Sequence, residues 1–200
     1  MYSIDPYVIE SIGRGPEKSY SLYSRLLKDR IIYVQGEIEE YMANSVSAQL
    51  MYLDQQEEKP IIMFINSPGG SVTDGLSIYD SMRFVESKII TVGVGQCCSM
   101  GSFLLSMGDV RLSFENTSLM YHSVSSGFHG TVQDYELDFL ETKRLQDLLV
   151  SKLKEKTLPE YHSEFDKKIE RNWWVLPEKA VEIGLIDKII TKKSDIKQYL

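Results

Sequence analysis

Short apolar runs alternate with stretches of helical period along the first half of the chain. Runs at 30–34, 61–65 and 89–94 predict buried strands. Between them, 44–55 and 73–85 place apolar residues three and four positions apart, which predicts two amphipathic helices. Strands and helices that alternate over such short connections are typical of an α/β fold.

The second half of the chain begins with two further apolar segments, at 110–112 and 119–121. A polar, glycine-containing stretch follows at 123–130. From 131 to 156 the apolar residues recur at helical spacing, which predicts one long amphipathic helix. That helix is longer than the core of a small domain needs.

The C-terminal part predicts shorter elements. Residues 163–172 favour a short helix that presents Asn172 near its end. Residues 177–183 begin with a proline suited to a first helical turn, and Gly184 suits the position just after a helix. Residues 185–190 are then expected to form a final strand.

Composition narrows the function classes. The chain has 200 residues, 42% of them hydrophobic and 26% charged, which is ordinary for one globular domain. The net charge of −7 and the absence of a basic stripe argue against a nucleic acid as the main partner. No apolar run approaches the ~20 residues that span a bilayer, and the N-terminus resembles no secretion signal. We therefore expect a cytoplasmic protein that does not contact a membrane.

The two cysteines, Cys97 and Cys98, are adjacent in the sequence. A disulfide between neighbours is geometrically strained, and the three histidines offer no metal-ligand spacing with them. No metal and no organic cofactor is predicted. The thiols are interpreted as two small buried residues, with a redox-sensitive thiol beside a nucleophile as the alternative.

A candidate nucleophile and a candidate base occur in one chain. Ser99 lies in the run Gly-Gln-Cys-Cys-Ser-Met-Gly at 95–101, and His122 follows some twenty residues later. The run Asn-Ser-Pro-Gly-Gly at 66–70 directly follows a predicted strand. Its glycines would leave backbone N–H groups open to a developing oxyanion, although the same run also suits a tight turn between strand and helix.

Several runs in order resemble the ClpP peptidase family. They are Ile-Asn-Ser-Pro-Gly-Gly at 65–70, Ser-Ile-Tyr-Asp at 77–80, the Ser99 run continued to Leu105, and Ala-Val-Glu-Ile-Gly-Leu-Ile-Asp at 180–187. Weaker matches at 23–27 and 41–44 extend the resemblance over residues 8 to 190. Because these motifs are unrelated to one another, the resemblance is specific.

The resemblance implies a ClpP/crotonase-like fold of repeated β-β-α units with a protruding handle helix. It implies that Ser99 is the nucleophile, that His122 is the general base, and that the N–H groups of Gly70 and Met100 form the oxyanion hole. The position of the third catalytic residue, an aspartate in the family, falls on Asn172.

The resemblance also implies a self-compartmentalising assembly. Two stacked heptameric rings, a tetradecamer, would enclose the sites, and an AAA+ unfoldase of the ClpX, ClpA or ClpC type would feed unfolded polypeptides into the barrel, where they would be cut to short peptides. Residues 1–20 would form an axial loop, or a mobile terminus, and 21–200 a single peptidase domain. A handle at about 123–157 would interlock the rings, although a plain surface helix gives the same pattern.

Asn172 leaves three interpretations open. Asparagine can accept a hydrogen bond from a histidine but carries no negative charge. The chain could be a serine endopeptidase of weakened activity, a subunit active only when a partner ring fixes its site geometry, or a catalytically impaired structural ring subunit that co-assembles with a second ClpP paralogue. A crotonase-type acyl-CoA enzyme is a further rival, because fold alone does not establish proteolysis. We favour retained peptidase activity that is weakened or conditional, because Ser99, His122 and the glycine turn are all present.

Overall fold

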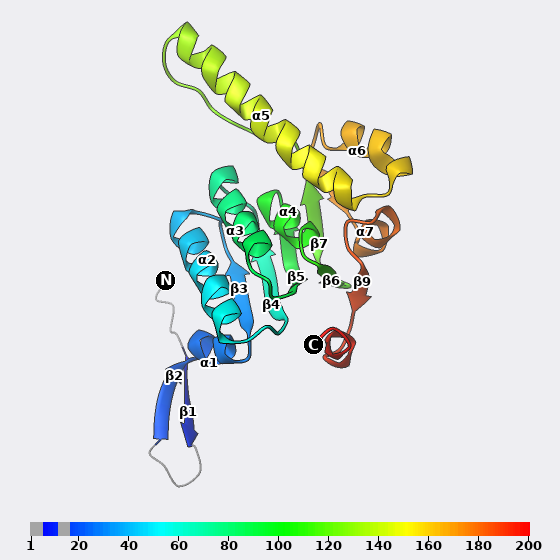
Figure 1. Cartoon of the computed structure of the whole chain (residues 1–200). Helices are drawn as coiled ribbons and strands as arrows, with labels where there is room; N and C mark the ends of the chain where they lie inside the picture. Colours follow the sequence, from blue (N-terminus) through cyan, green and yellow to red (C-terminus); the bar gives the residue numbers. More distant parts are fainter. Residues whose placement is uncertain (1–5, 12–16) are drawn as a thin grey trace.

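A parallel sheet runs through the centre of the computed structural model, which describes residues 6–11 and 17–200. Within these residues the sheet has seven strands, five of which lie in the order β3-β4-β5-β6-β9, all parallel (Figure 1). The expected α/β class is confirmed. The five strands are β3 (Ile31–Gln35), β4 (Ile61–Ser67), β5 (Ile89–Cys98), β6 (Val110–Phe114) and β9 (Lys188–Ile190).

Three helices connect the first strands: α2 (Glu40–Gln56) and α3 (Val72–Phe84), which the sequence predicts, and α4 (Met100–Ser106). Alternate residues of β4 face opposite sides of the sheet, as a pleated strand requires. Met63 and Ile65 join the larger core, which includes buried residues of these helices. Ile62 joins a smaller core on the other face, closed by Ile196 of α8 (Ser194–Lys197). Strand β4 is therefore covered on both sides.

Strand β5 is longer than predicted and pairs with two successive strands on one side. Its residues 90–93 pair with β6, and its last three residues pair in parallel with β7 (Ser118–Tyr121). The short strand β8 (Trp173–Val175), which the sequence did not predict, pairs antiparallel with β7. The ends of β5 and β7 consequently lie side by side.

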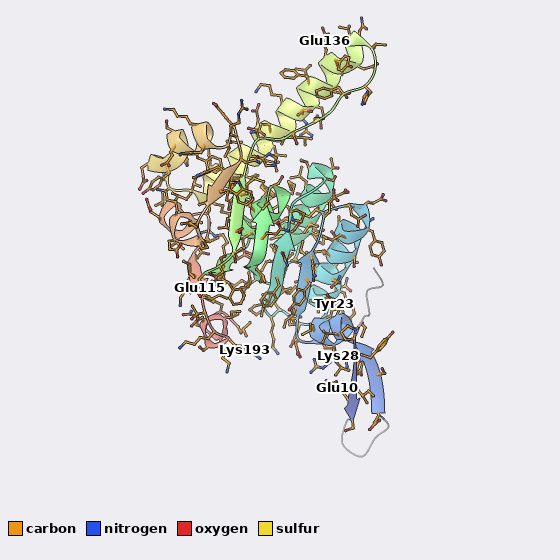
Figure 2. All side chains as sticks on the ribbon, turned by 180° about the vertical axis from the view of Figure 1, so that it is seen from behind. Glu10, Tyr23, Lys28, Glu115, Glu136 and Lys193 are labelled. Atoms are coloured by element: carbon orange, nitrogen blue, oxygen red, sulfur yellow. The ribbon has the colours of Figure 1, made fainter. Side chains whose placement is uncertain are left out.

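Helix α5 (Val132–Lys156) confirms the long amphipathic helix. Thr131 caps it through a reciprocal pair of hydrogen bonds with Asp134. The helix projects from the sheet, and Glu136 lies near its free end (Figures 1 and 2). The preceding residues, 122–129, belong to no helix or strand.

A hairpin extends from the opposite end of the molecule (Figure 1). It pairs β1 (Tyr7–Ser11) with β2 (Glu17–Ser21) and leads into α1 (Leu22–Lys28). The sequence predicted neither the hairpin nor this helix. An ion pair between Arg25 and Glu10 joins the helix to the hairpin. The expected axial loop at 1–20 is only partly covered, because residues 1–5 and 12–16 lie outside the described residues.

The C-terminal part departs from the prediction at one important point. The predicted 163–172 helix is α6 (His162–Lys168), which follows a 3₁₀ turn, η1 (Pro159–Tyr161). Asn172 therefore lies in the turn before β8 and not at the end of a helix. Helix α7 (Pro177–Ile183) and the left-handed Gly184 after it match the prediction. Strand β9 is shorter than the predicted 185–190. In the described residues no helix is both long enough and apolar enough to cross a membrane.

Helix α4 packs on the core, and the contribution of this packing to the free energy of unfolding can be measured. Leu104 is fully buried (0% exposed), whereas Leu200 is 64% exposed. Leu104→Ala should lower the free energy of unfolding by about 2–5 kcal/mol, because it leaves a cavity. Leu200→Ala, the same chemical change at the surface, should lie within about 0.5 kcal/mol of the parent protein. Urea unfolding of both variants provides the comparison, and equal losses would contradict this description of the core.

Candidate active site

Ser99 lies at the sharp turn between β5 and α4. Its backbone has φ 54° and ψ −121°, a conformation that is rare for a residue other than glycine. Such strain costs on the order of 1–3 kcal/mol and persists only where neighbours hold it. Here the Ser99 N–H donates to the carbonyl of Met120 on β7 (2.8 Å). The Oγ of Ser102, one turn into α4, lies 2.7 Å from the Ser99 carbonyl oxygen and 2.8 Å from that of Met120.

His122 reaches Ser99 because β5 and β7 are parallel and in register. Cys98 pairs with Met120, so Ser99 and His122 both leave the sheet at the same edge. The Nε2 atom of His122 lies 2.9 Å from the Oγ of Ser99. Partial burial lowers the pKa of the imidazole below its ordinary value, which keeps the ring neutral at pH 7. A neutral imidazole can take the proton of the hydroxyl.

Asn172 lies next to His122 across the sheet edge. Tyr121 pairs with Trp173 in the antiparallel ladder of β7 and β8, which brings the two flanking residues together. Both line one shallow hollow, which Glu170 also borders. Among the described residues, however, the Asn172 side chain makes no hydrogen bond to the imidazole. The structure thus places the third residue beside the base without joining the two.

The glycine turn before α3 packs against both neighbouring loops. A Cβ on Gly69 would lie 2.6 Å from the Cβ of Ser99, and one on Gly70 would lie 2.1 Å from the carbonyl oxygen of Ile38. No other residue type fits this close approach. Two backbone hydrogen bonds fix the turn, from Ile38 N–H to the Gly69 carbonyl (2.8 Å) and from Ser71 N–H to the Ile38 carbonyl (2.9 Å).

Two backbone donors in this region have no acceptor. Within the described residues, neither the Gly70 N–H nor the Met100 N–H donates a hydrogen bond. Met100 is the first residue of α4, where N–H groups have no partner inside the helix. Gly70, Met100 and Ser99 line the same cavity. These free donors suit a negative charge that develops on a substrate oxygen beside Ser99.

Apolar and polar side chains both line the cavity beside Ser99, and one of its walls comes from the base of α5. The apolar part of the lining favours an uncharged side chain of a bound substrate. Its polar lining residues include Ser123, Ser125 and Gln146. The aliphatic and phenyl side chains of the lining are Val72, Met100, Phe103, Val124, Leu149, Val150, Leu153 and Ile169.

Sequence reasoning missed three polar residues of this site: Ser102, Ser123 and Gln146. Ser102 braces the Ser99 backbone, and the other two hold the segment after His122. For Gln146 a signal existed. It lies three positions before Leu149 and seven before Leu153, so it interrupts the apolar stripe of a helix with a polar group.

The two cysteines are buried, as the simpler interpretation predicts. The Cys97 thiol donates to the carbonyl oxygen of Ile65 (3.1 Å), and burial raises its pKa to about 12. Burial also raises the pKa of Cys98. Protonated thiols react slowly with oxidants, so the structure gives no support to a redox-sensitive thiol. The described residues contain no cluster of three or more side chains able to bind a metal ion.

Known proteins resemble this chain over almost its whole length. The model of the Clp protease family matches residues 14–193. The chain is also 46% identical, over 192 residues, to the ATP-dependent Clp protease proteolytic subunit of Deinococcus radiodurans. That alignment covers 94% of this chain and 93% of the Deinococcus protein.

The contact between Ser99 and His122 predicts that Ser99 reacts with a fluorophosphonate, which modifies only activated serines. Intact mass and peptide mapping should find one adduct, on Ser99. The rate should fall in acid with a midpoint below 6.5, the ordinary histidine pKa, because burial keeps His122 neutral to lower pH. Rates measured from pH 5 to 8 give this midpoint.

His122→Ala should abolish the adduct. His129→Ala is the matched control, because His129 is exposed and lies outside the cavity. An adduct that survives His122→Ala, or that forms on another serine, would contradict the assignment.

Proposed function

The chain belongs to the Clp protease family, and on this premise we propose that it cleaves polypeptides with Ser99 as nucleophile, His122 as general base and the N–H groups of Gly70 and Met100 as oxyanion hole. It is a serine endopeptidase. The single observation that carries the assignment of roles is the 2.9 Å contact between Ser99 Oγ and His122 Nε2, beside two backbone N–H groups that donate no hydrogen bond within the described residues.

The geometry supports a two-step mechanism. His122 takes the proton of Ser99 while Oγ attacks the scissile carbonyl carbon, and the carbonyl oxygen becomes an oxyanion that the two N–H groups hold. The imidazolium then gives its proton to the leaving amine as the C–N bond breaks. In the second step His122 takes a proton from water, which attacks the acyl group, and returns it to Ser99.

Asn172 weakens this mechanism in our proposal. A carboxylate at this position would fix the tautomer of the base and stabilise the imidazolium by its charge. The amide oxygen of asparagine can fix the tautomer in part, but it has no charge with which to stabilise the imidazolium. In a well-studied serine protease the change from aspartate to asparagine lowers kcat about 10⁴-fold. We therefore propose slow but real turnover.

We further propose that the chain works in the cytoplasm in closed rings served by an ATP-driven unfoldase. The Deinococcus relative is named an ATP-dependent proteolytic subunit, which supports such an assembly. The free end of α5 supports it too, because it exposes a group of apolar side chains far from the sheet (Figure 2). These are Val132, Tyr135, Leu137, Phe139 and Leu140, and we assign them to the contact between rings.

Two rival functions receive no support. An acyl-CoA enzyme of similar fold would not need a serine in contact with a histidine, and the comparisons match this chain to a protease. A purely structural subunit would not need the strained Ser99 backbone or the two free donors. The peptidase accounts for all of these features.

Asn172→Asp should raise kcat for a short peptide about tenfold or more, because the new carboxylate stabilises the imidazolium. The same charge raises the pKa of His122, so the acid limb of the rate profile should move to higher pH. Both effects are measured with a fluorogenic peptide between pH 5 and 9.

Asn116→Asp makes the same chemical change in the turn between β6 and β7 and should leave the rate unchanged. Particle size is checked by light scattering for every variant. An Asn172→Asp protein that assembles like the parent, with equal or lower turnover, would refute the weakening role of Asn172.

A further inference from the structure

The segment that follows His122 is held from two sides. The N–H of Ser123 donates to the carbonyl oxygen of Ile169 at the end of α6 (2.7 Å), and the Ser123 hydroxyl donates to the same oxygen (3.0 Å). The N–H of Val124 donates to Oε1 of Gln146 on α5 (2.6 Å). The Nε2 of Gln146 also lies 3.4 Å from the Ser123 hydroxyl. We call this set of contacts the 123–146 clamp.

The clamp holds the chain on the C-terminal side of His122, whereas β7 holds it on the N-terminal side. Strand β7 ends at Tyr121, and residues 122–129 belong to no helix or strand. Within the described residues, the hydrogen bond of the imidazole is the one to Ser99. The position of the ring is therefore set by β7 on one side and by the contacts of residues 123 and 124 on the other.

The partners of the clamp belong to the site. Ile169 lies three residues before Asn172, so the Ser123 bonds also set the distance between the base and the third residue. Gln146 lies on the stripe of α5 that carries Leu149 and Leu153 and lines the cavity of Ser99. A polar group at this place needs a hydrogen-bond partner, and the Val124 N–H provides one.

We propose that Gln146 is a positioning residue for His122, which it holds against Ser99 through the hydrogen bond from Val124. The proposal rests on the proposed role of His122 as general base. In this proposal Gln146 does not touch the reacting atoms. Its acceptor oxygen keeps residues 123–124 against α5 and so keeps the imidazole within hydrogen-bond distance of the nucleophile, at a site where no carboxylate holds the ring.

Two substitutions separate this role from simple packing. Gln146→Glu keeps an acceptor oxygen for the Val124 N–H but adds a charge, whereas Gln146→Leu keeps an apolar side chain of similar size and removes the acceptor. If the hydrogen bond matters, the Gln146→Glu variant has the higher kcat of the two. If only packing matters, the Gln146→Leu variant has the higher kcat, because a carboxylate is costly in an apolar wall.

The experiment measures peptide hydrolysis and the amide exchange of residues 122–126 in the assembled full-length protein. For Gln146→Leu we expect kcat to fall about tenfold or more, with KM within about twofold of the parent value. Exchange in the segment should become faster. For Gln146→Glu, kcat should stay within about threefold of the parent and exchange should stay slow. Gln55→Leu, at an exposed position of α2, is the matched control and should change nothing.

The proposal is overturned if the leucine variant equals or exceeds the glutamate variant in kcat, or if neither variant changes the exchange of residues 122–126. Failure of the proposed function would look different. Ser99→Ala would then hydrolyse peptide as fast as the parent protein, whatever happens at residue 146. Because amide exchange does not require turnover, it tests the clamp in either case.

Discussion

The backbone of Ser99 is the constraint on which the rest of the site depends. A serine at φ 54° is stable only because its N–H is paired with Met120 and its carbonyl with the Ser102 hydroxyl. The bond to Met120 requires β7 to lie beside β5 in parallel, and this pairing delivers His122 to Ser99. Nucleophile and base are thus aligned by one set of main-chain contacts, before the third residue contributes anything.

In the part of the chain that the structure describes, no carboxylate bonds the ring of His122, and the electrostatics of the base follow from this. Burial alone shifts the pKa of His122, and it shifts it downward. A low pKa keeps the ring in the form that accepts a proton, which favours the first step of the reaction. It also makes the imidazolium that forms in that step less stable. A charged aspartate would raise the pKa of His122 and stabilise the imidazolium. With Asn172 the transition state is less stabilised, but the base is neutral over a wider pH range.

The sequence predicted the parts of the fold whose signal is local and strong. The apolar runs of β3, β4 and β5 and the periodic segments of α2, α3 and α5 were all found within a few residues of their true bounds. Elements of three to seven residues with few buried side chains, such as α1, β8 and α8, carry no such periodicity and were missed. The end of α6 was misplaced, so the predicted surroundings of Asn172 were wrong.

Ser99 and His122 were proposed from their motifs, and the contact between them is present. The bonds of Ser123 and Gln146 cross 46 and 22 residues of chain, and no local pattern encodes them.

In our proposal helix α5 has two roles, which the sequence presents as one amphipathic pattern. Its free end exposes apolar residues that no described part of this chain covers, while its base forms a wall of the cavity and holds Gln146 against Val124. An α-helix of 25 residues with a capping box is a stiff element, so its two ends do not move independently. The same helix therefore carries the exposed apolar group at one end and, towards the other, the side chain that bonds the Val124 N–H. In our proposal the bond from Val124 to Gln146 matters more because residue 172 carries no carboxylate, so the imidazole depends on its backbone support where an ion pair would otherwise fix it.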